Sequence, residues 1–151
     1  MSTTPVRRFT AAADGFRWLG VELTRYKPEG AAPFRDVTRQ TLFRRDDMRG
    51  ELRYFEVAPG GHSTLERHAH AHAVMILRGA GRVLVGTAIH DVAALDLVTV
   101  PPHTWHQFRA GAAALGFLCM VDAARDKPEL PDDATWAELR AAPGVAEFLA
   151  T

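Results

Sequence analysis

The sequence predicts an all-β fold, an antiparallel sandwich or barrel followed by short helices at the C-terminal end. Two observations indicate this class. Short apolar runs recur at spacings of about 8–12 residues with glycine and proline turns between them, which is typical of antiparallel sandwiches and barrels. The chain of 151 residues, 47% of them hydrophobic, is long enough for one domain with a sizeable core and too short for a second full domain.

Residues 1–50 are expected to form N-terminal strands and an arm. The residues at 16–26 and at 38–45 have a strand-like pattern, and the lysine, glycine and prolines of residues 27–33 favour a loop between them. Residues 1–14 carry arginines but no continuous apolar block of the kind found in secretory signals, so we expect the mature protein to begin near residue 1.

Six β-type runs between residues 51 and 122 are expected to form the barrel itself. Glycine and proline turns separate them. The predicted strands cover residues 52–57, 74–77, 83–85, 97–100, 105–109 and 115–121. The longest stretch without a charged or strongly polar residue, 110–121, falls well short of the roughly 20 residues that a membrane-spanning helix needs, so it is interpreted as a core strand.

Residues 123–151 are expected to form a helical tail. Asp132 and Asp133 precede the run at 134–140, as acidic residues often do at a helix N-terminus. Pro143 and Gly144 separate this run from a last short helix at 145–149. The tail is interpreted as a cover for apolar surface on the barrel, a lid or a dimer contact.

Charge and cysteine content limit the class of partner. The 18 basic and 18 acidic residues cancel, and the sequence pI is near 7.1. This balance argues against a nucleic-acid or membrane-surface partner and favours a small molecule or another protein. The single cysteine, Cys119, excludes an intrachain disulfide and makes the cytosol the simplest compartment.

Histidines are concentrated in one short segment. Four of the seven lie between residues 62 and 72, and Glu66 lies among them. Residues two apart on a strand are separated by about 6–7 Å, so these side chains cannot all bind one ion without a bend and a ligand from elsewhere. His106, which follows the Pro101-Pro102 turn, is the expected returning ligand.

Residues 59–109 resemble the cupin family. Its first motif is a Gly, five residues, His-x-His, three or four residues, Glu, six residues and Gly. Here Gly60 and Gly79 bracket the same spacing, with Glu66 at the first His position, His68 at the second and His72 at the Glu position. Residues 96–108 resemble the second motif, and His106 stands at the position of its single His ligand.

The resemblance implies a jelly-roll barrel whose two motifs converge on one divalent metal ion. The implied ligands are Glu66, His68, His72 and His106. His70 is expected outside this set, because the family turns between two strands there. If Glu66 instead faces outward, in an ion pair with Arg67 or another arginine, the ligands are three histidines and His70 becomes a candidate fourth. Cupin barrels commonly pair through N-terminal strands, so residues 16–45 are expected to form a homodimer contact.

Such a ligand set permits several reactions. Three imidazoles and one carboxylate accommodate Mn, Fe, Co, Ni or Zn, and open coordination positions would accept a small metabolite with two neighbouring oxygens. The implied function is a small metalloenzyme, dioxygenase-like or an enolate-forming isomerase or lyase. The alternative is a non-catalytic protein that binds a sugar or an acid. Candidates for a catalytic acid or base are His70, His103 and Glu66.

Other side chains near the motifs leave alternatives open. Trp105 and Phe108 could line the ligand pocket or fill the core. Cys119 could be a small buried hydrophobe or a neighbour of the metal. Either Arg53 or Tyr54 could orient a substrate, and the alternation of the strand does not decide which of them faces inward. His62 and His90 are interpreted as structural.

Overall fold

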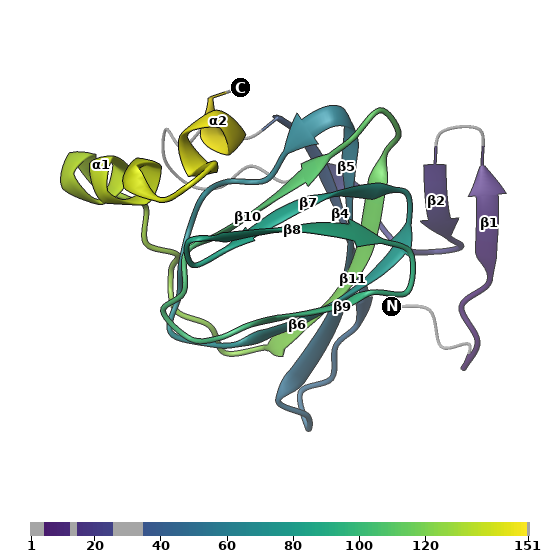
Figure 1. Ribbon diagram of the computed structural model, residues 1–151. Coiled ribbons are helices and arrows are strands. Elements are labelled where there is room, and N and C mark those ends of the chain that lie inside the picture. Colours follow the sequence, from purple (N-terminus) through teal and green to yellow (C-terminus); the bar gives the residue numbers. More distant parts are fainter. Residues whose placement is uncertain (1–4, 13–14, 26–34, 151) are drawn as a thin grey trace.

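A curled antiparallel sheet forms the body of the protein (Figure 1). In residues 5–12, 15–25 and 35–150, which the computed structural model describes, the sheet has nine strands, and a separate two-stranded hairpin and two helices complete the fold. The elements are β1 (Phe9–Ala12), β2 (Gly15–Trp18), β3 (Thr24–Arg25), β4 (Arg35–Phe43), β5 (Gly50–His62), β6 (His72–Arg78), β7 (Ala80–Val85), β8 (Ala88–Ala93), β9 (Leu97–Val100), β10 (His106–Ala110), β11 (Leu115–Asp122), α1 (Asp133–Ala141) and α2 (Val145–Leu149). The predicted all-β class with short C-terminal helices is confirmed.

The long strand β5 joins the two halves of the curled sheet. Its first part pairs with β11, from Gly50 opposite Asp122 to Val57 opposite Leu115. Its last residue, His62, pairs with Arg109 of β10. The strand order of the sheet is β8-β7-β10-β5-β11-β6-β9, so β5 links its two halves. Strand β4 also pairs with β5, and β3 pairs with β4. In Figure 1, β6 and β9 lie below the interior of the barrel and β7, β8 and β10 above it, and β11 slants between the two levels.

The apolar core fills this space because side chains alternate along each strand. On β11, Phe117, Cys119 and Val121 are buried, whereas Met120 between them is 57% exposed. They pack with residues of the facing strands, among them Val74, Ile76, Val83 and Phe108. Full burial of each such apolar side chain contributes about 1.5–3 kcal/mol, so this core accounts for much of the stability of the barrel.

Gly79 allows the tight passage from β6 to β7. Its φ is +75°, a left-handed conformation that side-chain-bearing residues rarely adopt. A Cβ at this position would also collide with the carbonyl oxygen of Ala114. The glycine that ends the first motif is thus required by backbone geometry.

Most predicted elements are confirmed, with differences at the edges of the sheet. All six runs of the central segment correspond to strands, and β5 continues to His62. The run predicted at 16–26 is divided into β2 and β3, and the loop predicted at 27–33 lies outside the described residues. Strand β8 was not predicted, because Val92 is its one fully buried residue and its apolar alternation is weak.

The C-terminal helices cover the outer surface of the barrel. Asp132 caps α1 by accepting a hydrogen bond from the backbone N–H of Thr135 at 2.8 Å. Phe148 of α2 is 1% exposed and packs in a cluster with Leu65 and Leu84. The interpretation of the tail as a cover is therefore confirmed. Because Leu65 directly precedes Glu66, the tail also holds the segment that carries the histidines.

The β1–β2 hairpin packs against the face of β5 that points away from the barrel interior. The rings of Phe16 and Trp18 contact Tyr54, with centroids 5.8 and 5.1 Å away. Tyr54 donates a hydrogen bond to Glu56, and burial raises the pKa of its hydroxyl above the usual range. Tyr54 therefore faces the hairpin, and its neighbour Arg53 faces the interior. In the described part of the chain, every helix falls short of the length and apolar character needed to cross a membrane.

Candidate metal centre

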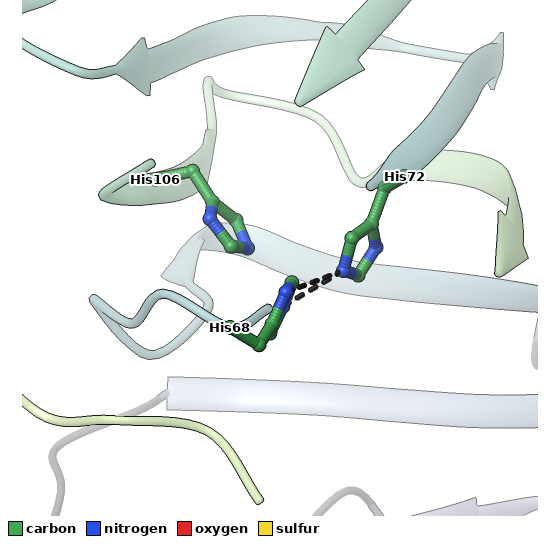
Figure 2. Close-up of side chains that lie close together, drawn as sticks. All are labelled: His68, His72 and His106. Atoms are coloured by element: carbon green, nitrogen blue, oxygen red, sulfur yellow. Dashed lines mark hydrogen bonds between the residues drawn. The ribbon is translucent and has the colours of Figure 1, made fainter. Parts of the chain in front are cut away.

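Three histidines from separate places in the fold meet inside the barrel. His68 lies in the irregular segment between β5 and β6, His72 begins β6, and His106 begins β10. One ring nitrogen from each lies within 4.8 Å of the others, and Figure 2 shows the three rings directed toward a common point. The Nε2 atoms of His68 and His72 are 2.7 Å apart. Because the chain is not extended between β5 and β6, His68 and His72 can approach the same point, as their spacing in the sequence requires.

Each ring is oriented by a contact at its Nδ1 atom. His68 Nδ1 lies 3.2 Å from the carbonyl oxygen of His70, and His106 Nδ1 lies 2.9 Å from that of Thr104. His72 Nδ1 lies 3.1 Å from Cys119 Sγ. A carbonyl oxygen can only accept, so these two contacts are hydrogen bonds in the tautomer that has the proton on Nδ1, and that tautomer leaves the Nε2 lone pair for the centre. A partner on the far nitrogen is the usual arrangement of metal-binding histidines.

The surroundings keep these imidazoles neutral. Burial, followed by the neighbouring imidazoles, lowers the pKa of His68 to about 4. Burial also lowers the pKa of His106 to about 4 and holds that of His72 well below its usual range. Neutral imidazole is the form that binds a cation. The donor set thus fits a divalent metal ion.

Glu66 lies beside this group. Its Oε1 is 4.0 Å from His68 Nε2, and among the described residues its buried Oε2 has no hydrogen-bond partner. Burial raises the pKa of Glu66 to about 7, against the opposing charge of Arg53. A buried carboxylate oxygen without a partner is costly, and a bound cation would satisfy it. The alternative of an ion pair with Arg67 does not hold, since Arg67 donates to Glu129 at 2.5 Å.

The other histidines differ in their relation to the centre. His70 stacks on His68 with ring centroids 4.0 Å apart, and its Nδ1 lies 2.9 Å from Asp126 Oδ1. His103 is exposed and absent from the pocket lining; its backbone N–H donates to the carbonyl oxygen of His68. The structure therefore brings His70 to the site and leaves the His103 ring outside it. His62, near Ser63 and Gln107, also lies outside the pocket.

A pocket of about 210 Å³ opens onto the three histidines. Its apolar walls are formed by Val37, Phe55, Val74, Phe108 and Phe117. Trp105 is instead packed in the cluster under the C-terminal helices. The polar lining includes Arg39, Arg125 and Asp126, which sequence reasoning did not identify. No local motif marks these three residues, because Arg39 on β4 and the segment after β11 meet only in the folded chain.

Cys119 lies in the same pocket and contacts the centre. Its side chain is 2% exposed, and its Sγ lies 3.5 Å from Arg53 Nη2 as well as 3.1 Å from His72 Nδ1. Burial raises the pKa of the thiol, whereas the charge of Arg53 lowers it. Both sequence interpretations apply, since Cys119 is buried in the apolar core and also lies beside a candidate ligand.

Comparisons with known proteins agree with this architecture. Residues 53–121 match the family model described as a cupin domain. The chain is 62% identical to 1-methylthio-D-xylulose 5-phosphate methylsulfurylase of Rhodospirillum rubrum over 95% of this chain and 92% of that protein. It resembles the crystal structure of a cupin-2 domain protein of R. rubrum, with a TM-score of 0.85, 60% identity and 97% coverage of both chains. A cupin 2 conserved barrel protein of Rhodopseudomonas palustris gives a TM-score of 0.87 and 56% identity, over 95% of this chain and 97% of the other.

Proposed function

The chain belongs to the cupin family, and from that premise we propose that it is a metal-dependent enzyme that removes the methylsulfur group of 1-methylthio-D-xylulose 5-phosphate. The observation that carries this proposal is the contact between Cys119 and His72 within a pocket lined by three convergent histidines. A thiol placed against candidate metal ligands suits the transfer of a sulfur group that the name of the R. rubrum relative describes.

The proposed substrate has the neighbouring oxygens expected from the sequence. A 1-methylthio ketose phosphate has a carbonyl group at C2, a hydroxyl group at C3 and the methylsulfur group on C1. His68, His72 and His106, with Glu66, would hold a divalent cation that supplies Lewis acidity to the carbonyl and hydroxyl oxygens. The apolar walls of Phe108 and Phe117 would suit the methylsulfur group of the substrate.

Cys119 is the proposed acceptor of the methylsulfur group. Its thiolate attacks the substrate sulfur, so that an S–S bond forms and the C1–S bond breaks. The electron pair of that bond passes to C1 and the C2 carbonyl as an enolate, which takes one proton from water at C1. The sugar is reduced to the 1-deoxy ketose phosphate, and Cys119 is oxidised to a methyl disulfide. A low-molecular-weight thiol then releases the methylthio group by disulfide exchange.

Neighbouring residues favour the thiolate that this step needs. With Nε2 of His72 directed at the centre, its Nδ1–H donates toward Cys119 Sγ at 3.1 Å. The Arg53 guanidinium lies 3.5 Å from the same sulfur. Both contacts stabilise negative charge on sulfur and oppose the effect of burial.

This proposal narrows the functions expected from the sequence. Enolate formation remains part of it, whereas oxygen chemistry of the dioxygenase type is not needed for a methylsulfur transfer. A non-catalytic sugar-binding protein has no need of a thiol at the candidate ligands. That alternative would be supported by binding without turnover.

The test is turnover of 1-methylthio-D-xylulose 5-phosphate by untagged, metal-loaded protein with an added thiol, followed by NMR of the C1 protons. We expect a 1-deoxy ketose phosphate to form. Without the added thiol, mass spectrometry should detect one methylthio group on Cys119. The matched variant Cys119→Ser should retain the metal and lose both signals. Full activity of Cys119→Ser would overturn the role of the thiol, and an inactive wild type would overturn the proposed function.

A further inference from the structure

Three arginines are among the residues that line the pocket, although the chain as a whole carries no net charge. Arg39 comes from β4, Arg53 from β5, and Arg125 from the segment that follows β11. Their proximity is reflected in Arg125, whose pKa is lowered by burial and by the charges of Arg53 and Arg39, against the effect of Glu51. The fold has thus gathered cationic groups that are far apart in the sequence.

Arg53 and Arg125 share one buried carboxylate, that of Glu51. Glu51, which is 4% exposed, has its Oε1 3.3 Å from Arg125 Nη1 and 3.7 Å from Arg53 Nε. Its other oxygen lies 3.8 Å from Arg44. One carboxylate therefore faces three guanidinium groups and balances the charges of Arg53 and Arg125 only in part.

The acidic residues of the pocket lining are engaged elsewhere. Glu66 lies beside the three histidines. Asp126 accepts a hydrogen bond from the backbone N–H of Ala69 at 2.9 Å and contacts His70. Both carboxylates therefore have contacts outside the arginine group, although the charge of Arg53 also acts on Glu66.

Arg53, which lines the pocket, has an unsatisfied buried donor. The residue is 6% exposed, and its Nε has no hydrogen-bond partner among the described residues. The 3.7 Å separation from Glu51 is too long for a hydrogen bond. A buried charged donor without an acceptor is costly, and the planar guanidinium matches a phosphate group well.

We infer that Arg39, Arg53 and Arg125 form the subsite for the phosphate group of a sugar-phosphate substrate, an inference that rests on the proposed function. The position of the subsite suits this role. Arg53 contacts Cys119 Sγ, and Cys119 Sγ contacts His72. A ketose phosphate would thus present its carbonyl end to the histidines, its methylsulfur group to Cys119 and its phosphate to the arginines.

The test is calorimetric binding of ligands that lack the methylsulfur group, so that turnover does not enter. The probes are D-xylulose 5-phosphate, D-xylulose and inorganic phosphate, with metal-loaded protein. The wild type should bind the phosphate ester at least about tenfold more tightly than the free sugar, because charge-assisted hydrogen bonds are strong. Inorganic phosphate should compete with the ester. Equal affinity for ester and sugar would overturn the inference.

Two variants on different segments keep the test decisive. Arg125→Gln and Arg39→Gln should each weaken binding of the ester by at least about tenfold and leave binding of D-xylulose unchanged. The control Arg45→Gln removes an arginine that pairs with Asp47 on the exposed surface, and it should behave like the wild type. Unchanged ester affinity in both folded pocket variants would refute the subsite.

The two proposals can fail separately. If the arginine variants lose affinity for the ester but the wild type does not consume 1-methylthio-D-xylulose 5-phosphate, the subsite stands and the proposed function fails. If turnover is observed and KM is the same in wild type, Arg125→Gln and Arg39→Gln, the function stands and the subsite fails.

Discussion

Glu66 and His106 are joined by two backbone hydrogen bonds, in which each residue donates its N–H to the carbonyl oxygen of the other, at 3.3 and 3.0 Å. This bridge places a carboxylate from the first motif next to the imidazole from the second. One β-type pairing therefore brings together two residues that are 40 positions apart in the sequence. The relative position of two candidate ligands is set by the backbone.

Replacing His106 by alanine should remove most of the bound metal. The imidazole is buried, directs Nε2 toward the other two histidines, and leaves a smaller donor set when it is absent. Element analysis of protein purified without a His tag should find close to one divalent ion per wild-type chain. The matched variant His90→Ala, on exposed β8, should retain it. A wild type purified without metal would contradict the candidate centre.

Replacing Glu66 by glutamine should weaken metal binding more than replacing His70 by alanine. Glu66 has a buried oxygen without a partner, whereas His70 is already bound to Asp126. Competition with a metal indicator would compare the two dissociation constants, and we expect a loss of about tenfold or more for Glu66→Gln. The opposite ranking would assign the fourth ligand to His70.

Replacing Phe148 by alanine should lower the free energy of unfolding by about 3–5 kcal/mol, because a fully buried aromatic side chain is removed. Chemical denaturation measures this change. The variant should also bind metal less tightly, since Phe148 and Leu65 belong to one cluster and Leu65 precedes Glu66. Glu147→Ala, an exposed change on the same helix, should alter stability by no more than about 0.5 kcal/mol. Equal stability of the two variants would argue against the supporting role of the tail.

We propose that residues 16–45 pair two copies of the chain. Within the described part of this region, Leu19 is 59% exposed and Leu23 is 37% exposed, as suits an apolar contact. Light scattering at micromolar concentration should give the mass of a dimer, and Leu19→Asp should shift it toward the monomer. Leu95→Asp changes an exposed leucine elsewhere and should remain dimeric. A monomeric wild type would reject this contact.

Much of the barrel could be predicted because its signals are local. The alternation along 115–121 and the glycine at position 79 reflect the pleat of a strand and the conformation of a turn, so each can be read within a few residues. The convergence of His68, His72 and His106 could be anticipated because the spacing in two motifs matched a known family.

The remainder of the pocket depends on relationships that no short segment contains. Arg53 and Tyr54 are adjacent on one strand, and only the packing of the β1–β2 hairpin against Tyr54 determines which one faces inward. The His103 ring was expected near the pocket from its place beside the second motif, yet the residue is exposed and has a φ of +57°. Arg125 reaches the pocket from beyond the last strand, where composition carries no sign of this role.

The position of Cys119 gives the protein an internal reporter. It is the one cysteine of the sequence, and its sulfur lies inside the pocket against His72. The rate at which a small thiol-alkylating reagent modifies the protein will therefore report how accessible the Cys119 sulfur is. Occupancy of the cavity can be monitored by labelling kinetics, with no probe added to the chain.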